Sequence, residues 1–178
     1  WRDSKNRALG TLATMATSIV AEMEMTLNKL QNSELNKEAA KEMKAFADLV
    51  AKLPAPHDEL ARKMIIQCTK KDSAPLKSRM MVLFVTHEII IAVSKLHTPT
   101  FRPQWASVIR AVAPWCLLGM GSAASHQGAA LDRSSLSNVL KVLKAWLWAD
   151  KEAAAGWIKE AEALRDAASV PGGARLPP

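Results

Sequence analysis

The chain has 178 residues, 49% of them hydrophobic, and a formal net charge of +7 at pH 7. This length and composition allow one sizeable core, which predicts a single domain over residues 1–169. The charge favours an acidic partner, namely nucleic acid, a phosphorylated peptide or an anionic membrane surface, and does not choose among them. Cys68 and Cys116 do not have CxxC spacing, and no secretory segment is recognised near Trp1. Both observations argue against a disulfide framework, so we expect two reduced core cysteines. The sequence begins at Trp1 rather than at methionine, so we expect it to be part of a longer protein.

Two amphipathic helices are predicted at the start of the chain. Apolar residues at three- and four-residue spacing over residues 4–30 predict an opening helix with one polar side. A polar stretch follows, from Gln31 to Asn36. A second helix is predicted from Glu34 or Lys37 to about residue 53, where prolines end it.

The stretch 75–95 is predicted to be the central helix of the fold, because it is apolar on nearly every side. A third helix precedes it, from the N-cap candidate Asp58 to the solvated run 70–73. Pro75 suits the first turn of the central helix. Four polar residues interrupt the apolar pattern: Lys77, Arg79, His87 and Glu88. The remaining runs are shorter than the roughly 20 apolar residues that a membrane span requires.

The second half of the chain predicts three further helices. A turn at residues 98–102 precedes the fifth helix, which Gly119 and Gly121 are expected to stop. Residues 122–130, small and polar, are predicted to form a surface loop.

The sixth helix is predicted to begin at Asp132 or Ser134, and the last to cover residues 151–168. Residues 170–178 are expected to be a flexible tail or linker. No strand-like alternation of useful length occurs, so the sequence predicts an all-α fold of about seven helices. Such helices form either a closed bundle or a right-handed superhelical stack of antiparallel pairs, and periodicity does not distinguish these two.

Common catalytic motifs are absent from the sequence: there is no glycine-rich phosphate loop, HExxH, GxSxG or acid–base pair of carboxylates. We therefore predict no enzyme and no catalytic residue. The histidines never stand four residues from each other or from a cysteine, as in helical zinc sites, so no metal or other cofactor is predicted. They are His57, His87, His97 and His126. We expect His97 and His126 to be turn or loop residues at the surface.

His87 interrupts the apolar pattern of the central helix, next to Glu88. As a core or boundary residue, it needs only one backbone or carboxylate partner. As a groove residue, it offers a hydrogen bond to a ligand and titrates near neutral pH. The sequence supports both interpretations equally.

Basic residues are distributed differently in the two halves of the chain. In the second predicted helix, bases alternate with acids as in ordinary pairing on a helix surface: Lys37, Glu38, Lys41, Glu42 and Lys44. Between residues 101 and 148, five bases face the single acid Asp132: Arg102, Arg110, Arg133, Lys141 and Lys144. The last three belong to one helix, and their side chains form either an ordinary solvated face or a binding site for phosphate.

The tryptophans are predicted to serve mainly in the core. Four lie on the apolar stripes: Trp105, Trp115, Trp146 and Trp157. Trp148 points elsewhere, and we expect it to be exposed. Because tyrosine is absent and phenylalanine scarce, an aromatic platform for nucleic-acid bases is poorly supported.

Several segments resemble the CTD-interacting domain family, whose members bind the repetitive C-terminal tail of the largest RNA polymerase II subunit. They are NKEAAKEMKAFA from Asn36, MMVLFVTHEIIIAVSK from Met80, FRPQWASVIRAVAPWCLLG from Phe101 and DRSSLSNVLKVLKAWL from Asp132. The resemblance covers residues 36–150. It implies a right-handed superhelix of about eight helices, with a groove formed by the second, fourth and seventh helices. It also implies a nuclear protein that acts in transcription termination, elongation or RNA 3′-end processing.

The resemblance implies a binding site for a serine-phosphorylated polymerase-tail peptide. The expected peptide contacts are Asn36, Lys37, Lys44, Phe84, His87 and Ile91, and the expected phosphate contacts are Arg133, Lys141 and Lys144. The chain departs from the family at three positions. The aspartate and serine of the family's fourth helix fall on His87 and Glu88, and its phosphate-binding arginine falls on Leu136, one turn after Arg133.

Other partners remain open. VHS and ENTH domains share this architecture, and an adaptor of that kind binds anionic lipid or sorting peptides. A helical scaffold for other proteins is a third possibility, and the basic surface leaves RNA open as a further ligand.

Overall fold

The computed structural model describes residues 21–33, 36–53, 55–96, 101–126 and 133–168, and these contain helices and no strand. A first helix, described over residues 21–32, precedes six others. Their bounds are α2 (Lys37–Ala51), α3 (Ala55–Cys68), α4 (Leu76–Leu96), α5 (Phe101–His126), α6 (Arg133–Ala145) and α7 (Lys151–Ala167). The all-α prediction is confirmed. The tail 170–178, His97 and residues 4–20 of the opening helix lie outside the described residues.

The N-terminal helix boundaries differ from the prediction by a few residues. The first helix includes Gln31, because this side chain donates to Cys68 Sγ of α3 at 2.9 Å and keeps the last turn against the core. Asn36 caps α2, its side-chain oxygen accepting from the Ala39 backbone N–H at 2.9 Å. α3 begins at Ala55, before the predicted cap Asp58, because the first turn of a helix needs no backbone donor and so accepts Pro56.

α5 is longer than predicted at both ends. It begins at Phe101, within the predicted turn, and continues past Gly119 and Gly121 to His126, which was expected in a loop. The glycines do not stop the helix, since glycine permits a helix end without requiring one. Gly119 instead makes room for the buried Arg79: a Cβ at this position would lie 2.4 Å from Arg79 Cδ.

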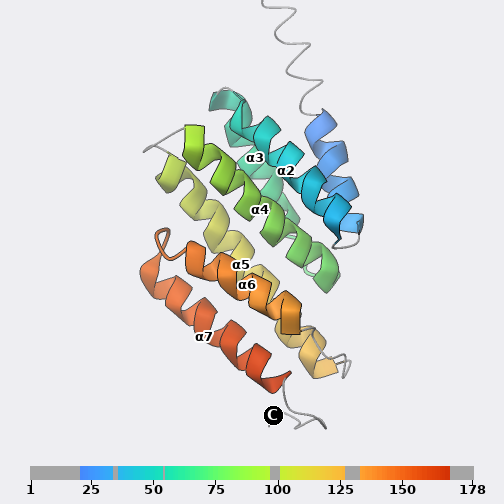
Figure 1. The fold of residues 1–178 in the computed structure, drawn as a ribbon, viewed down its shortest axis with the longest axis vertical. Helices are drawn as coiled ribbons and strands as arrows, with labels where there is room; N and C mark the ends of the chain where they lie inside the picture. The colour runs from blue at the N-terminus through green and yellow to red at the C-terminus, as the bar shows by residue number, and fades with distance from the viewer. Residues whose placement is uncertain (1–20, 34–35, 54, 97–100, 127–132, 169–178) are drawn as a thin grey trace, which may run out of the picture.

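α4 is the central helix, as predicted, and it packs against α2, α3, α5 and α6. Figure 1 shows α2, α4 and α6 side by side and running in the same direction, with α3 and α5 behind them and α7 beside α6. The first helix lies beside α2 in Figure 1, and its last turn also contacts the start of α4, where the Ser78 hydroxyl donates to the Gln31 carbonyl at 2.9 Å. One hydrophobic cluster extends from Met23 of the first helix to Ala161 of α7. The described residues therefore share one core in a stack of helices.

The cysteines and most tryptophans occupy the predicted core positions. Cys68 and Cys116 are free and buried. Trp105 and Trp146 are fully buried, and Trp115 nearly so. Trp157 is only half-buried, because α7 is the last helix of the stack and has a neighbour on one side only.

Arg79 fixes the start of α4 to its surroundings. Its Nη1 donates to the Trp115 carbonyl at 2.8 Å and its Nε to the Ala74 carbonyl at 3.0 Å, while Nη2 donates to the Asp72 carbonyl. Its guanidinium also lies 5.0 Å from the centroid of the Trp115 ring. A buried charge is tolerated when its donors are paired, and here those pairs connect α4 to α5 and to the α3–α4 turn.

Candidate functional site: the α2–α4–α6 face

The middle of α4 has one stripe that the core does not cover. Phe84, His87, Glu88 and Ile91 are half-buried, whereas the intervening residues are buried. Their three- and four-residue spacing places them on one side of the helix. Because α3 and α5 lie behind α4, this side faces outward between α2 and α6. We call the surface formed by this stripe and its two neighbouring helices the α2–α4–α6 face.

His87 sits at the edge of the stripe nearest α6. Its ring meets the Trp146 ring in an edge-on arrangement, with 6.2 Å between centroids and 63° between planes. Its Nδ1 is buried and has no hydrogen-bond partner among the described residues, and the same holds for Trp146 Nε1. His87 therefore lacks, at Nδ1, the partner that a satisfied core histidine requires.

Burial disfavours the charged form of this imidazole. Burial lowers the pKa of His87 from its ordinary value, and the Glu88 carboxylate opposes this shift without reversing it. A cation over an indole ring gains about 0.5 to 2 kcal/mol. An unpaired buried donor costs about 1 to 3 kcal/mol, and more when it is charged. The cost of leaving a charged N–H unpaired therefore exceeds the gain from the indole ring, which agrees with the lowered pKa of His87.

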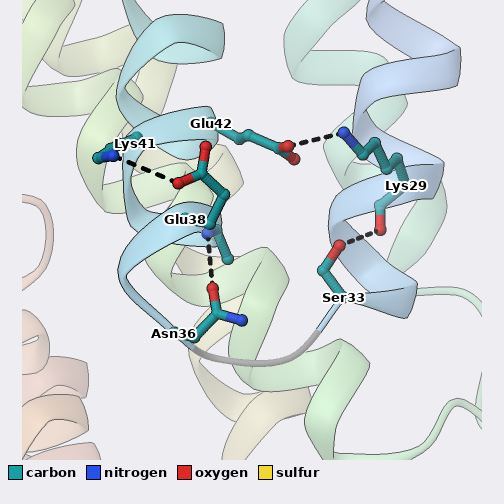
Figure 2. Close-up of polar contacts among 7 residues, drawn as sticks. Lys29, Ser33, Asn36, Glu38, Lys41 and Glu42 are labelled. Carbon is teal, nitrogen blue, oxygen red and sulfur yellow. Dashed lines mark hydrogen bonds and ion pairs between the residues drawn. The ribbon is translucent and has the colours of Figure 1, made fainter.

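α2 borders the face with a row of lysines. Lys37, Lys41, Lys44 and Lys52 are exposed and share one side of the helix. Figure 2 shows that the predicted surface pairing holds only in part: Lys41 pairs with Glu38 at 3.3 Å.

The other acid, Glu42, turns to the first helix, where it pairs with Lys29 at 2.6 Å. Lys37 and Lys44 are consequently without an ion pair among the described residues. Asn36 uses its side-chain oxygen to cap α2, which leaves its amide N–H groups for a ligand.

α6 carries the predicted phosphate-binding residues on the other flank of the stripe, and Arg133, Lys141 and Lys144 are all exposed. Arg133 and Lys144, eleven residues apart, share the side of α6 that faces α7, whereas Trp146 meets His87 of α4. Lys144 pairs with Glu162 of α7 at 3.3 Å, and Lys141 Nζ donates to Asn138 at 3.4 Å. Arg133, at the first residue of α6, has no ion pair within the described part of the chain. About 12 Å of helix separates Arg133 from Lys141, so the three side chains do not converge on a single phosphate.

Two other arginines of the second half have structural partners. Arg110 pairs with Asp150 at 3.0 Å, which connects α5 to the α6–α7 turn. The Arg102 guanidinium lies 5.6 Å from the Trp148 ring centroid, so the prediction that Trp148 is exposed is wrong: it is half-buried. Both arginines are exposed, but the pairing of Arg110 with Asp150 reduces the unpaired excess of bases in this part of the chain.

The described residues contain no group of three or more His, Cys, Asp or Glu side chains that could hold a metal ion. Residues 102–124 of α5 are long and apolar enough to cross a membrane, and 56% of their most apolar 18-residue stretch is buried inside the protein. No protein-family model, curated protein or solved structure matches this chain. What the face can bind is therefore inferred from its own residues.

The face combines an apolar stripe with cations on both sides. Phe84 and Ile91 offer apolar contacts to a ligand, and His87 and Glu88 offer hydrogen bonds. The lysines of α2 offer charge to anionic groups beside the stripe, and Arg133 offers charge at the exposed start of α6. This arrangement suits an extended chain that carries both apolar and anionic groups.

Proposed function

We propose that this chain is a non-catalytic module that binds an extended, serine-phosphorylated peptide across the α2–α4–α6 face. The observation that carries the proposal is the half-buried stripe of α4, which the lysines of α2 border on one side, with the exposed cations of α6 further out on the other. Lys37, Lys44 and Arg133 have no ion pair among the described residues, so no described residue competes with an anionic group for them.

The resemblance to the CTD-interacting domain family supports a polymerase-tail peptide as the ligand and a nuclear location. In that family the groove is formed by the second, fourth and seventh helices. The segment that resembles the family's seventh helix is α6 here, and α2, α4 and α6 lie side by side. A right-handed superhelix is part of the same proposal. The position of the family's arginine is occupied by Leu136, which is fully buried, so we assign phosphate binding to Arg133.

The proposal is tested by titrating the labelled chain with serine-phosphorylated and unphosphorylated polymerase-tail peptides at two salt concentrations. We expect tighter binding of the phosphorylated peptide and a weaker preference at high salt, because exposed charges are screened. Arg133→Ala should cost about 1.5 to 3 kcal/mol of binding free energy, the range for a hydrogen bond to a charged group.

Lys63→Ala is the matched control, because this exposed lysine belongs to α3, behind the face, and pairs with Glu59. Equal losses in the two variants would show a general charge effect and remove Arg133 from the site. Binding to anionic vesicles without binding to either peptide would instead favour an adaptor of the VHS or ENTH kind.

A further inference from the structure

The contact between His87 of α4 and Trp146, just after α6, contains two buried polar atoms without partners. His87 Nδ1 and Trp146 Nε1 both lack a hydrogen bond, although their rings touch at 6.2 Å between centroids. Unpaired buried polar atoms are uncommon, and each calls for an explanation. We call this contact the α4–α6 seam.

The seam joins two parts of the molecule that pack on α4 to different extents. α4 packs extensively on α2 and α5, whereas its contact with α6 is limited and α6 packs mainly on α7. α7 also packs against α5, and Arg110 of α5 pairs with Asp150 beside α7, so an opening of this seam moves α6 and α7 away from α4 and α5 together. The contacts of α4 with α2 and α5 can stay in place during such a local opening.

We propose that His87 is a proton-operated latch on the α4–α6 seam. The neutral imidazole closes against Trp146 and tolerates an unpaired nitrogen. Protonation gives Nδ1 a charged N–H that faces no acceptor in the closed seam. Opening the seam exposes this N–H to water, so acid shifts the population towards the open form.

The charged groups around the imidazole act against protonation only weakly or not at all. Glu88, on the same helix, is the described charge that acts on His87, and it favours the protonated form. On α6, Lys144 is paired with Glu162 and Lys141 donates to Asn138. Lys44 of α2 is exposed to solvent. Burial is therefore the main factor that disfavours protonation of His87 in the closed seam.

The test follows the indole N–H of Trp146 and the imidazole of His87 by NMR in the full chain without ligand. We expect the protection of the Trp146 N–H against exchange, corrected for the intrinsic effect of pH, to fall by about tenfold per pH unit between the pKa of His87 in the open form and its lower pKa in the closed form. Protection should level off below the pKa at which His87 titrates in the closed form.

Trp105 is the matched internal control, because its Nε1 is also buried and unpaired but its residue belongs to α5. Its protection should not follow the titration of His87. His87→Asn should make the protection of Trp146 independent of pH. Glu88→Gln removes the carboxylate that favours protonation, so it should move the transition to lower pH.

Two results would overturn the latch. One is protection of Trp146 that stays constant while His87 titrates, and the other is a loss of protection by Trp105 and Trp146 together, which indicates global unfolding. The measurement needs no peptide, so it stands apart from the proposed binding function. With the latch in place, the α2–α4–α6 face changes its shape with pH.

Discussion

Gly119 and Gly121 lie on the same helix and present opposite surroundings to an added methyl group. A Cβ at Gly119 would lie 2.4 Å from Arg79 Cδ and 2.9 Å from Arg79 Nε, whereas a Cβ at Gly121 would have no atom within 4 Å. Arg79 cannot simply move aside, because its guanidinium is held by three backbone carbonyls. We therefore predict that Gly119→Ala destabilises the protein and that Gly121→Ala does not.

The size of the effect follows from three terms. Overpacking costs about 1 to 3 kcal/mol. Losing one hydrogen bond of the Arg79 guanidinium costs about 1.5 to 3 kcal/mol. Alanine returns about 1 kcal/mol through its helix propensity. The free energy of unfolding should then fall by about 1.5 to 5 kcal/mol in Gly119→Ala and rise by up to about 1 kcal/mol in Gly121→Ala.

Urea unfolding followed by circular dichroism measures both variants, and a double-mutant cycle with Arg79→Ala tests the cause. If Arg79 is the obstacle, Gly119→Ala should cost little in the Arg79→Ala background, since the side chain that it displaces is gone. Equal stability of Gly119→Ala and Gly121→Ala would refute the reasoning, as would a cost that persists without Arg79.

Two further predictions concern titratable groups. Burial raises the pKa of Cys116 to about 12, so its thiol should not react with a disulfide reagent at pH 8 until the protein unfolds; rapid labelling of the native chain would contradict this. The Ala153 backbone N–H, helped by Arg110, lowers the pKa of Asp150, so this carboxylate stabilises the fold above its unfolded pKa and loses that contribution as pH falls through the folded pKa. Asp150→Asn keeps an oxygen to cap α7 and should flatten the acid limb of a plot of unfolding midpoint against pH, whereas an unchanged acid limb would exclude Asp150 as its source.

Sequence periodicity predicted the helices because each one buries a stripe with helical spacing. The surroundings of α4 follow from its apolar pattern, and the two polar residues of the half-buried stripe, His87 and Glu88, are positions at which that pattern is interrupted. Phe84 and Ile91 belong to the apolar pattern, so their partial exposure could not be read from it. The end of α5 could not be predicted in this way. Gly119 looks like a stop signal until Arg79, forty residues earlier in the sequence, is seen to occupy the space beside it.

The exposure of the candidate-site residues was predictable, but their pairing was not. Exposure of Lys37, Lys44 and Arg133 follows from their places on amphipathic helices. Periodicity gives no partners between helices, so it could not show that Lys144 meets Glu162. The unpaired Nδ1 of His87 could not be predicted either, because it is buried beside Trp146, which is far away in the sequence.

The central claim, that the α2–α4–α6 face binds an anionic peptide, is tested most directly by mapping the bound peptide on the protein. Amide signals of the ¹⁵N-labelled chain are followed by NMR during titration with the serine-phosphorylated polymerase-tail peptide. We predict that the largest shifts occur at Lys44, at His87 and its neighbours on α4, and at Arg133. Shifts confined to α3 and α7, with these residues unchanged, would contradict the account.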